Sequence, residues 1–158
     1  MSSNKYGKKH VSKLPEALYN KMQQGKSIAL VGTFSEKGNP HTSLLQFIYP
    51  IDQESVLISI NKNRKTYDNL VWQKMVSVTL VEENDLCFSF LARAGVVQAP
   101  SFTHPEFYIV RLDIVDIKSD KSQLISIDKG IKWHFKGDAE MIFSISMMAE
   151  LKVLAGEI

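Results

Sequence analysis

The chain has 158 residues, 44% hydrophobic and 23% charged, which is typical of a single globular domain with a hydrophobic core. Its 19 basic and 17 acidic residues nearly balance, so the sequence lacks the strongly basic character of nucleic-acid-binding domains. It also contains no apolar run of membrane-spanning length, no hydrophobic signal-peptide centre, and only one cysteine, which excludes an internal disulfide. We therefore expect a cytoplasmic protein that contacts neither nucleic acid nor membrane.

Two features are predicted before the first strand. Residues 1–12 are polar and lysine-rich, which predicts a flexible terminus. Residues 14–24 are predicted to form a short amphipathic helix, because Leu14, Leu18 and Met22 fall on one face at helical spacing.

A series of strand patterns follows, separated by short turns rich in glycine, proline, asparagine and aspartate. The first pattern is apolar at most positions, which predicts a central strand, and Gly95 in a later pattern predicts a bulge or a close backbone approach. The expected strands cover residues 27–33, 41–49, 55–60, 75–81, 86–98 and 106–118, with weaker patterns at 124–127 and 131–135 around a hairpin turn at 128–130.

Residues 55–70 combine a strand, a basic turn and the start of a helix. Val56, Ile58 and Ile60 alternate with their neighbours, so one face of this strand is expected to be better buried than the other. The turn that follows contains asparagines, which favour turns, and three cations in five residues.

A helix is predicted after this turn, over residues 65–73. Asn63 is the expected N-cap, and Tyr67, Leu70 and Val71 are expected on the packed face because they follow the i, i+3, i+4 spacing.

Arg64 and Lys65 flank the predicted N-terminus of this helix. Free backbone N–H groups, the positive end of the helix dipole and two cations would then converge, which is suitable for binding an anion. The alternative is a solvated connection whose charges only keep it soluble, because short basic turns are common.

The tail is predicted to be helical over residues 144–155, with Gly156 as its cap, either closing the domain or packing on another subunit. Six to eight antiparallel strands with short loops and few helices predict a mainly β protein, namely a split or closed antiparallel β-barrel with peripheral helices. We expect a single domain over residues 1–158, with the barrel at 27–135.

Catalytic and metal-binding motifs are not evident. The four histidines are scattered and have no metal-ligand spacing, and the sequence lacks the glycine-rich and nucleophile motifs of NTPases, dinucleotide-binding enzymes and hydrolases. Cys87 lies in an apolar run, so it is predicted to be a small buried side chain rather than a nucleophile.

Three segments carry a family resemblance, and together they span roughly residues 27–99. IALVGTFSEKGNPHTSLLQFIY contains a strand, a Gly-x-Pro turn and a returning strand. LISINKNRKTYDNLVWQKMVSVTLV contains an Arg-Lys turn between a strand and a helix, and FLARAGVVQA has Ala92 in the place of a glycine. This order resembles the FMN-binding split-barrel family, which includes pyridoxamine 5′-phosphate oxidase and small general stress proteins.

The resemblance implies a homodimer with FMN at the subunit interface. Arg64 and Lys65 would bind the FMN phosphate with help from Asn63, in agreement with the anion site inferred from the residues themselves. The other positions that the resemblance places near the flavin are Ile58 and Ser59 on the preceding strand, and Ser43, Leu44 and Leu45 on the returning strand of the hairpin.

The chain departs from the oxidase itself at several positions. Ser43 stands where the oxidase has an arginine, and the C-terminal segment lacks the Arg-Pro and Glu-Phe-Trp signatures. Cys87 stands where the oxidase has a glutamine, so the resemblance places Cys87 among the cofactor-binding residues as well. Vitamin B6 oxidation is therefore not expected. The sequence predicts a small FMN-dependent oxidoreductase with an unidentified small-molecule substrate. The alternatives are a non-catalytic barrel that binds or senses a flavin or another ligand and, by fold analogy only, a haem-binding barrel.

Overall fold

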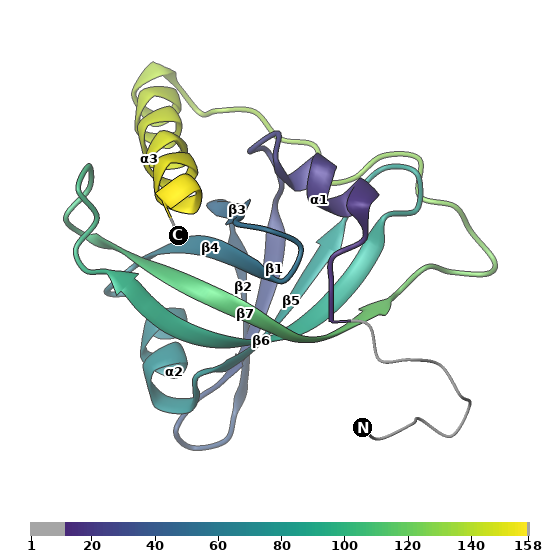
Figure 1. Cartoon of the computed structure of the whole chain (residues 1–158), viewed down its shortest axis with the longest axis horizontal. Coiled ribbons are helices and arrows are strands. Elements are labelled where there is room, and N and C mark those ends of the chain that lie inside the picture. The colour runs from purple at the N-terminus through teal and green to yellow at the C-terminus, as the bar shows by residue number, and fades with distance from the viewer. Residues whose placement is uncertain (1–11, 158) are drawn as a thin grey trace.

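The computed structural model describes residues 12–157, so the predicted flexible terminus lies almost wholly outside the described residues. The chain folds into a curled, mainly β structure with three helices around it (Figure 1). In chain order the elements are α1 (Glu16–Met22), β1 (Ala29–Phe34), β2 (Pro40–Leu45), β3 (Ile48–Pro50), β4 (Ser55–Asn61), α2 (Lys65–Gln73), β5 (Met75–Val81), β6 (Cys87–Gln98), β7 (Phe107–Ser119) and α3 (Asp138–Glu157).

The seven strands form one antiparallel sheet in the order β2-β1-β5-β6-β7-β4-β3. The two edge strands, β2 and β3, are consecutive in the chain, and only Gln46 and Phe47 lie between them. Because so short a link cannot cross a flat sheet, the sheet must curl until its edges meet. This confirms the predicted split barrel, and the link 46–47 marks its seam. The single returning strand expected at 41–49 is instead broken at this point.

The barrel interior contains the larger hydrophobic cluster. Side chains such as Val31, Val78, Phe90 and Leu112 point inward from four strands and are almost completely buried. Leu18 and Met22 of α1 pack onto this cluster, as does Leu14, which precedes the helix, and all three are inaccessible to solvent. The predicted residues are therefore buried, but the helix is shorter than the predicted range of 14–24.

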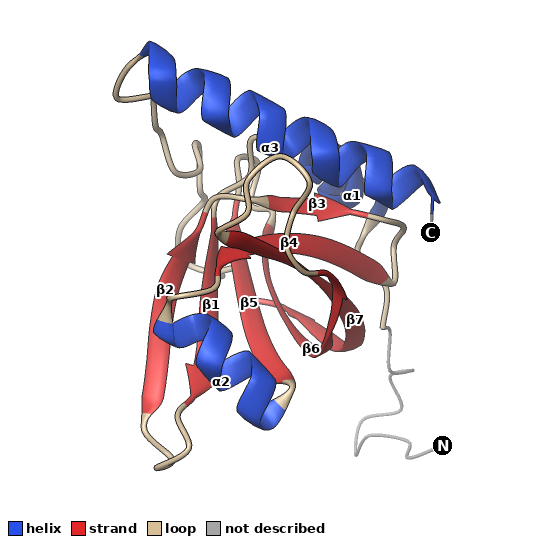
Figure 2. Ribbon diagram, turned by 90° about the vertical axis from the view of Figure 1, so that its left-hand side faces the viewer, coloured by secondary structure: helices blue, strands red, loops and turns tan. Residues whose placement is uncertain are grey.

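A second apolar layer lies outside the barrel, under α3. Figure 2 shows α3 crossing the barrel beside β3 and β4, where Leu57 and Ile109 pack against Met147 and Leu151. The prediction that one face of β4 is better buried was wrong, because residues 55–60 are all buried. One face of β4 lies in the barrel, and α3 covers the other.

Helix α2 packs on the barrel through a face that agrees with the prediction at Tyr67 and Leu70 but not at Val71. Its buried residues are Thr66, Asn69 and Leu70, whereas Val71 is 54% exposed. The reason is polar: the side-chain amide of Asn69 donates a hydrogen bond of 3.0 Å to Thr33 Oγ1 on β1, and both residues are buried. The amphipathic pattern cannot reveal this, since it assigns asparagine to solvent.

Replacing Asn69 with alanine is expected to lower the free energy of unfolding by about 1–3 kcal/mol, because the buried hydroxyl of Thr33 would lose its partner. Urea denaturation followed by circular dichroism measures the loss. Asn63→Ala in the exposed turn is the matched control and should leave the midpoint unchanged. Equal midpoints for the two variants would show that the Asn69–Thr33 bond contributes little.

The segment between β7 and α3 is not a β-hairpin. The strands expected at 124–127 and 131–135 and the turn at 128–130 were wrong, because residues 120–137 contain no strand or helix. The C-terminal helix begins earlier than residue 144, and Gly156 lies inside it rather than capping it. Gly95 pairs regularly with Arg111, and the register shifts fall at 91/92 and 96–98 instead.

None of the helices formed by residues 12–157 combines the length and the hydrophobicity that crossing a lipid bilayer requires.

Candidate functional site

A pocket of about 520 Å³ opens at the seam of the barrel, and we call it the seam pocket. This volume lies in the range of small-molecule sites. The seam pocket is bounded by the end of β2, the 46–47 link, the end of β4, the N-terminus of α2, the start of β7 and the first turns of α3. Its lining residues are Ser43, Leu44, Leu45, Gln46, Phe47, Ser59, Ile60, Asn61, Arg64, Thr66, Phe107, Ala139, Glu140, Phe143 and Ser144.

One part of the seam pocket is suited to an anion. Arg64 lines it and occupies the N-cap position of α2, with extended backbone angles and no capping hydrogen bond from its side chain. The predicted N-cap, Asn63, was therefore wrong by one residue. Asn61 supports the turn instead, because its side-chain oxygen accepts the backbone N–H of Asn63 at 2.9 Å. The first N–H groups of a helix have no partner within it, so α2 offers donors beside the guanidinium of Arg64.

Two hydroxyl groups lie beside this helix terminus. Ser43 Oγ and Thr66 Oγ1 share a hydrogen bond of 2.7 Å, and the Nε2 atom of His41 lies 3.4 Å from the same Thr66 oxygen. Because hydroxyl groups can donate as well as accept, the pair can reorient toward a bound anion. Ser43, which stands where the oxidase has an arginine, therefore still places a polar group in the seam pocket.

The rest of the seam pocket is largely apolar and aromatic. Leu45 and Ile60 line it from the two sides of the seam, and Phe107 and Phe143 add rings whose centroids lie 5.3 Å apart. Ser59 lines it as well, although its hydroxyl is directed to the sulfur of Met147 at 3.1 Å. Such a combination of a cationic part and a flat apolar part suits a ligand that has a planar ring and a phosphate group.

The structure brings together five of the nine residues predicted to contact a cofactor. Those that line the seam pocket are Ser43, Leu44, Leu45, Ser59 and Arg64. Four others do not line it. Ile58 is buried in the barrel interior, and Asn63 is exposed in the turn. Lys65 lines a separate hollow formed by residues 35–41, and Cys87 lies at the other end of the sheet.

The position of Cys87 follows from the strand register. Its neighbour Phe88 pairs with Ser119, the last residue of β7, whereas Phe107, the first residue of β7, lines the seam pocket. Cys87 is buried, as predicted. Burial raises the pKa of its thiol, with smaller contributions from the carboxylates of Asp85 and Asp120.

Cys87 should therefore react slowly with iodoacetamide in the native protein, because the reactive species is the thiolate and a raised pKa keeps the thiol protonated. The rate should rise only as the pH exceeds the ordinary thiol pKa of about 8.5. Labelling in urea, followed by mass spectrometry, provides the reference rate. Equal rates for native and unfolded protein would contradict this placement.

Several pocket residues escaped the sequence prediction. Thr66 could have been found, because it is a hydroxyl residue in the first turn of a helix that follows a basic turn. Glu140, Phe143 and Ser144 gave no such signal. They reach the seam pocket only because α3 begins at Asp138 and packs across the seam.

Comparison with known proteins gives a fold but no sequence relative. No family model matches the chain, and none of the curated proteins matches it. Among solved structures, a pyridoxamine 5′-phosphate oxidase-like protein from Lactobacillus delbrueckii is similar, with 18% identity over 68% of this chain and 95% of that one and a TM-score of 0.56. HutZ, the heme storage protein of Vibrio cholerae, has 16% identity over 67% of this chain and 94% of its own, with a TM-score of 0.53.

An F420 reductase is also similar, with 14% identity over 68% of this chain and all of its own, and a TM-score of 0.53. Identities this low establish the fold and leave the ligand open. The mainly β architecture, the curled seven-stranded sheet and these neighbours agree. The chain therefore has the split-barrel fold of the pyridoxamine 5′-phosphate oxidase-like proteins.

Proposed function

We propose that this protein is a small FMN-binding oxidoreductase that holds the flavin in the seam pocket. The observation that carries the proposal is the combination of Arg64 and the α2 N-terminus with an apolar, aromatic cavity of about 520 Å³. The phosphate would bind at Arg64, the α2 backbone and the Ser43–Thr66 hydroxyl pair. The ring would lie against the apolar walls.

The residues of the chain would position and shield the cofactor. Gln46 and Glu140 line the seam pocket and offer hydrogen-bonding groups for the polar edge of the ring. Phe107 and Phe143 exclude water from the apolar part. The bound flavin supplies the redox chemistry, so the protein itself needs no general acid or base at this site.

We further propose a homodimer in which the second copy closes the open side of the seam pocket. The outer face of the β1–β2 hairpin supports it, because Leu30 and Leu44 form an exposed cross-strand pair and Phe34 extends the same face. Leu44 also lines the seam pocket, so the apolar face is continuous with it.

Replacing Leu44 with glutamate should shift the protein from dimer to monomer on a sizing column and weaken flavin retention.

The absorbance spectrum of the freshly purified protein tests the cofactor assignment. We expect flavin bands, or a rise in melting temperature when FMN is added to the colourless protein, because a ligand that binds only the folded state stabilises it. Absence of both would contradict the proposal.

The second candidate function is a non-catalytic barrel that binds or senses a flavin. Ser43 at the place of the family's arginine favours it, since one phosphate cation is missing. Adding NAD(P)H to the FMN-bound protein separates the two functions. Loss of flavin absorbance would show that the bound FMN is reduced and favour the oxidoreductase, and unchanged absorbance would favour the non-catalytic barrel. The same spectrum tests haem binding, for which HutZ is the precedent in this fold, because haem would give a Soret band.

A further inference from the structure

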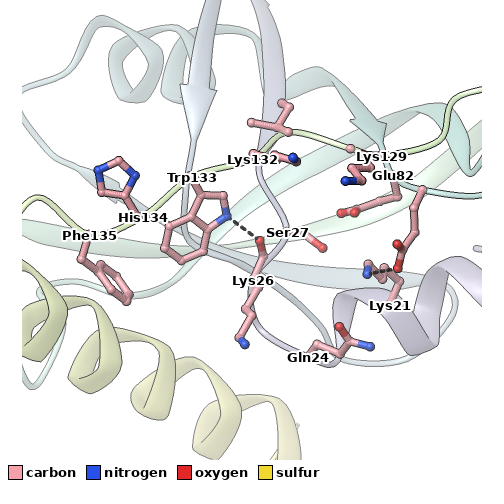
Figure 3. Close-up of a pocket in the computed structure, with 13 residues that line it drawn as sticks. Lys21, Gln24, Lys26, Ser27, Glu82, Lys129, Lys132, Trp133, His134 and Phe135 are labelled. Carbon is pink, nitrogen blue, oxygen red and sulfur yellow. Dashed lines mark hydrogen bonds and ion pairs between the residues drawn. The ribbon is translucent and has the colours of Figure 1, made fainter.

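A second hollow, of about 690 Å³, lies on another part of the molecule, beside α1 and the turn between β5 and β6 (Figure 3). Its outer wall is formed by residues 127–135, which we call the strap, and we call the hollow the strap pocket. The strap belongs to the connection between β7 and α3. A connection of this length without helix or strand is uncommon in a compact domain.

The strap is held at three points spaced three residues apart. The backbone N–H of Ile127 donates a hydrogen bond of 2.5 Å to the Asp85 side chain. Gly130 lies so close to β5 that an added Cβ atom would be 2.6 Å from the Val81 carbonyl oxygen. The indole N–H of Trp133 donates to the Lys26 carbonyl at 3.1 Å. The wall of the strap pocket is therefore built by specific contacts.

The strap pocket carries more positive than negative charge. Four lysines and two glutamates line it, and Glu83 is already paired with Lys21 at 2.7 Å. Within residues 12–157, no carboxylate lies within ion-pair distance of the ammonium groups of Lys26, Lys129 and Lys132. Figure 3 shows the Lys26 side chain extending toward α3, whereas Lys129 and Lys132 both lie on the strap. Two strap lysines without an ion pair among the described residues can bind a phosphate group, for which lysine serves as a point charge.

Ser27 provides an independent indication of a ligand. It lines the strap pocket and is only 3% exposed, and its hydroxyl is the buried side-chain polar atom that has no hydrogen-bond partner among the described residues. Figure 3 shows Ser27 between Trp133 and the Lys21 side of the hollow. Buried hydroxyl groups in folded proteins nearly always have a partner, so an orphan in a pocket wall points to a group that is supplied from outside.

Trp133 indicates which group the ligand carries in addition to its phosphate. Its indole N–H is fixed by Lys26, and Phe135 packs edge-on against it with ring centroids 5.0 Å apart. Trp133 as a whole residue is still 37% exposed, and it lines the strap pocket, so its ring is held in place while the residue stays accessible to a ligand. A fixed aromatic ring favours a planar partner. Glu82 lines the same hollow and can accept a hydrogen bond from a ligand hydroxyl.

We propose that the strap pocket is a second, separate site that binds a small phosphomonoester with a planar ring, of the size of a nucleoside monophosphate. The phosphate would be bound by Lys129 and Lys132 with the Ser27 hydroxyl, and the ring would lie on Trp133. This site does not depend on the proposed flavin site, because none of the residues that line the strap pocket lines the seam pocket.

The test uses adenosine monophosphate as the probe and Trp133 as the reporter. Trp72 is exposed on α2, so the Trp72→Phe protein keeps a single tryptophan, in the wall of the strap pocket, which can be excited selectively over the tyrosines. We expect saturable quenching of its fluorescence, competition by inorganic phosphate, and at least tenfold weaker binding of adenosine. Isothermal titration calorimetry of the unmodified protein gives an independent Kd. The titration extends to about 10 mM adenosine monophosphate, which exceeds the Kd of a weak complex. If neither method gives a saturable signal up to that concentration, the proposal is overturned.

Paired variants locate the site. Lys129→Ala with Lys132→Ala should raise the Kd for adenosine monophosphate at least about tenfold, and Ser27→Ala should raise it at least about threefold without unfolding the protein. The matched control, Lys37→Ala with Lys121→Ala, removes the same charge from exposed positions outside the strap pocket and should leave the Kd within about twofold. A double lysine variant that binds as well as this control would overturn the proposal.

The same variants separate this site from the flavin site. Arg64→Ala should leave the Kd for adenosine monophosphate unchanged, and the Lys129/Lys132 double variant should leave FMN retention unchanged. If Arg64→Ala abolishes adenosine monophosphate binding while the double variant has no effect, the nucleotide binds in the seam pocket and the strap pocket proposal fails.

Discussion

Replacing Arg64 with alanine is expected to raise the Kd for FMN by about ten- to a hundredfold. A hydrogen bond to a charged group is worth about 1.5–3 kcal/mol, and each 1.4 kcal/mol corresponds to about a tenfold change in affinity. Arg64 is an ionisable residue beside the α2 N-terminus in the seam pocket, so its loss leaves the phosphate only the helix N–H groups and two hydroxyls. Quenching of FMN fluorescence during titration measures the Kd.

Lys65→Ala is the matched control, because it removes the neighbouring cation of the same turn. Lys65 lines the hollow at residues 35–41 instead, so this variant should weaken FMN binding by less than about threefold through loss of long-range attraction. Arg64→Lys should give an intermediate Kd, since lysine keeps the charge but loses the planar donor group. Equal effects of Arg64→Ala and Lys65→Ala would contradict the assignment of the phosphate to the seam pocket.

The second large effect is expected at Leu151 on α3. Leu151 is completely buried against β4 and β7, so replacing it with alanine removes side-chain contacts and leaves a cavity. Such changes cost about 2–5 kcal/mol. Urea denaturation should therefore show a clearly lower midpoint. Because α3 also supplies Glu140 and Phe143 to the seam pocket, the same variant should bind FMN more weakly.

Val153→Ala is the matched control, because it also shortens a side chain of α3 to alanine but at an exposed position. Val153 is 60% exposed, so its replacement should change the free energy of unfolding by less than about 0.5 kcal/mol. Leu151→Ala protein that unfolds at the same urea concentration as Val153→Ala would show that α3 is not held to the barrel as described.

Much of the barrel could be predicted because its signals are local. The strict alternation at residues 75–81 reappears as alternating burial in β5, and the helical spacing of Leu18 and Met22 reappears as the buried face of α1. These patterns depend only on where successive side chains point along a strand or a helix. The start of α2 after the basic turn could also be predicted from the sequence, whereas anion binding at this turn stays a prediction.

Other features depend on long-range packing, which a local pattern does not contain. The apolar residues at 127–135 resemble strands, yet they form the strap because the Asp85 side chain and the Lys26 backbone carbonyl, both far away in the sequence, accept hydrogen bonds from it. The burial of both faces of β4 requires α3, which lies about 80 residues further along the chain.

Arg64 and Lys65 line different hollows for a local reason. Adjacent residues at a helix start do not share a face, so the two cations enter different hollows.

Hydrogen–deuterium exchange with and without FMN tests the central claim most directly, because it reports where the flavin binds as well as whether it binds. We predict slower exchange in peptides that cover residues 43–47, 59–66 and 139–144, which line the seam pocket, and unchanged exchange in the strap at 127–135. Protection confined to the strap, or no protection anywhere at saturating FMN, would contradict the assignment of the seam pocket as a flavin site.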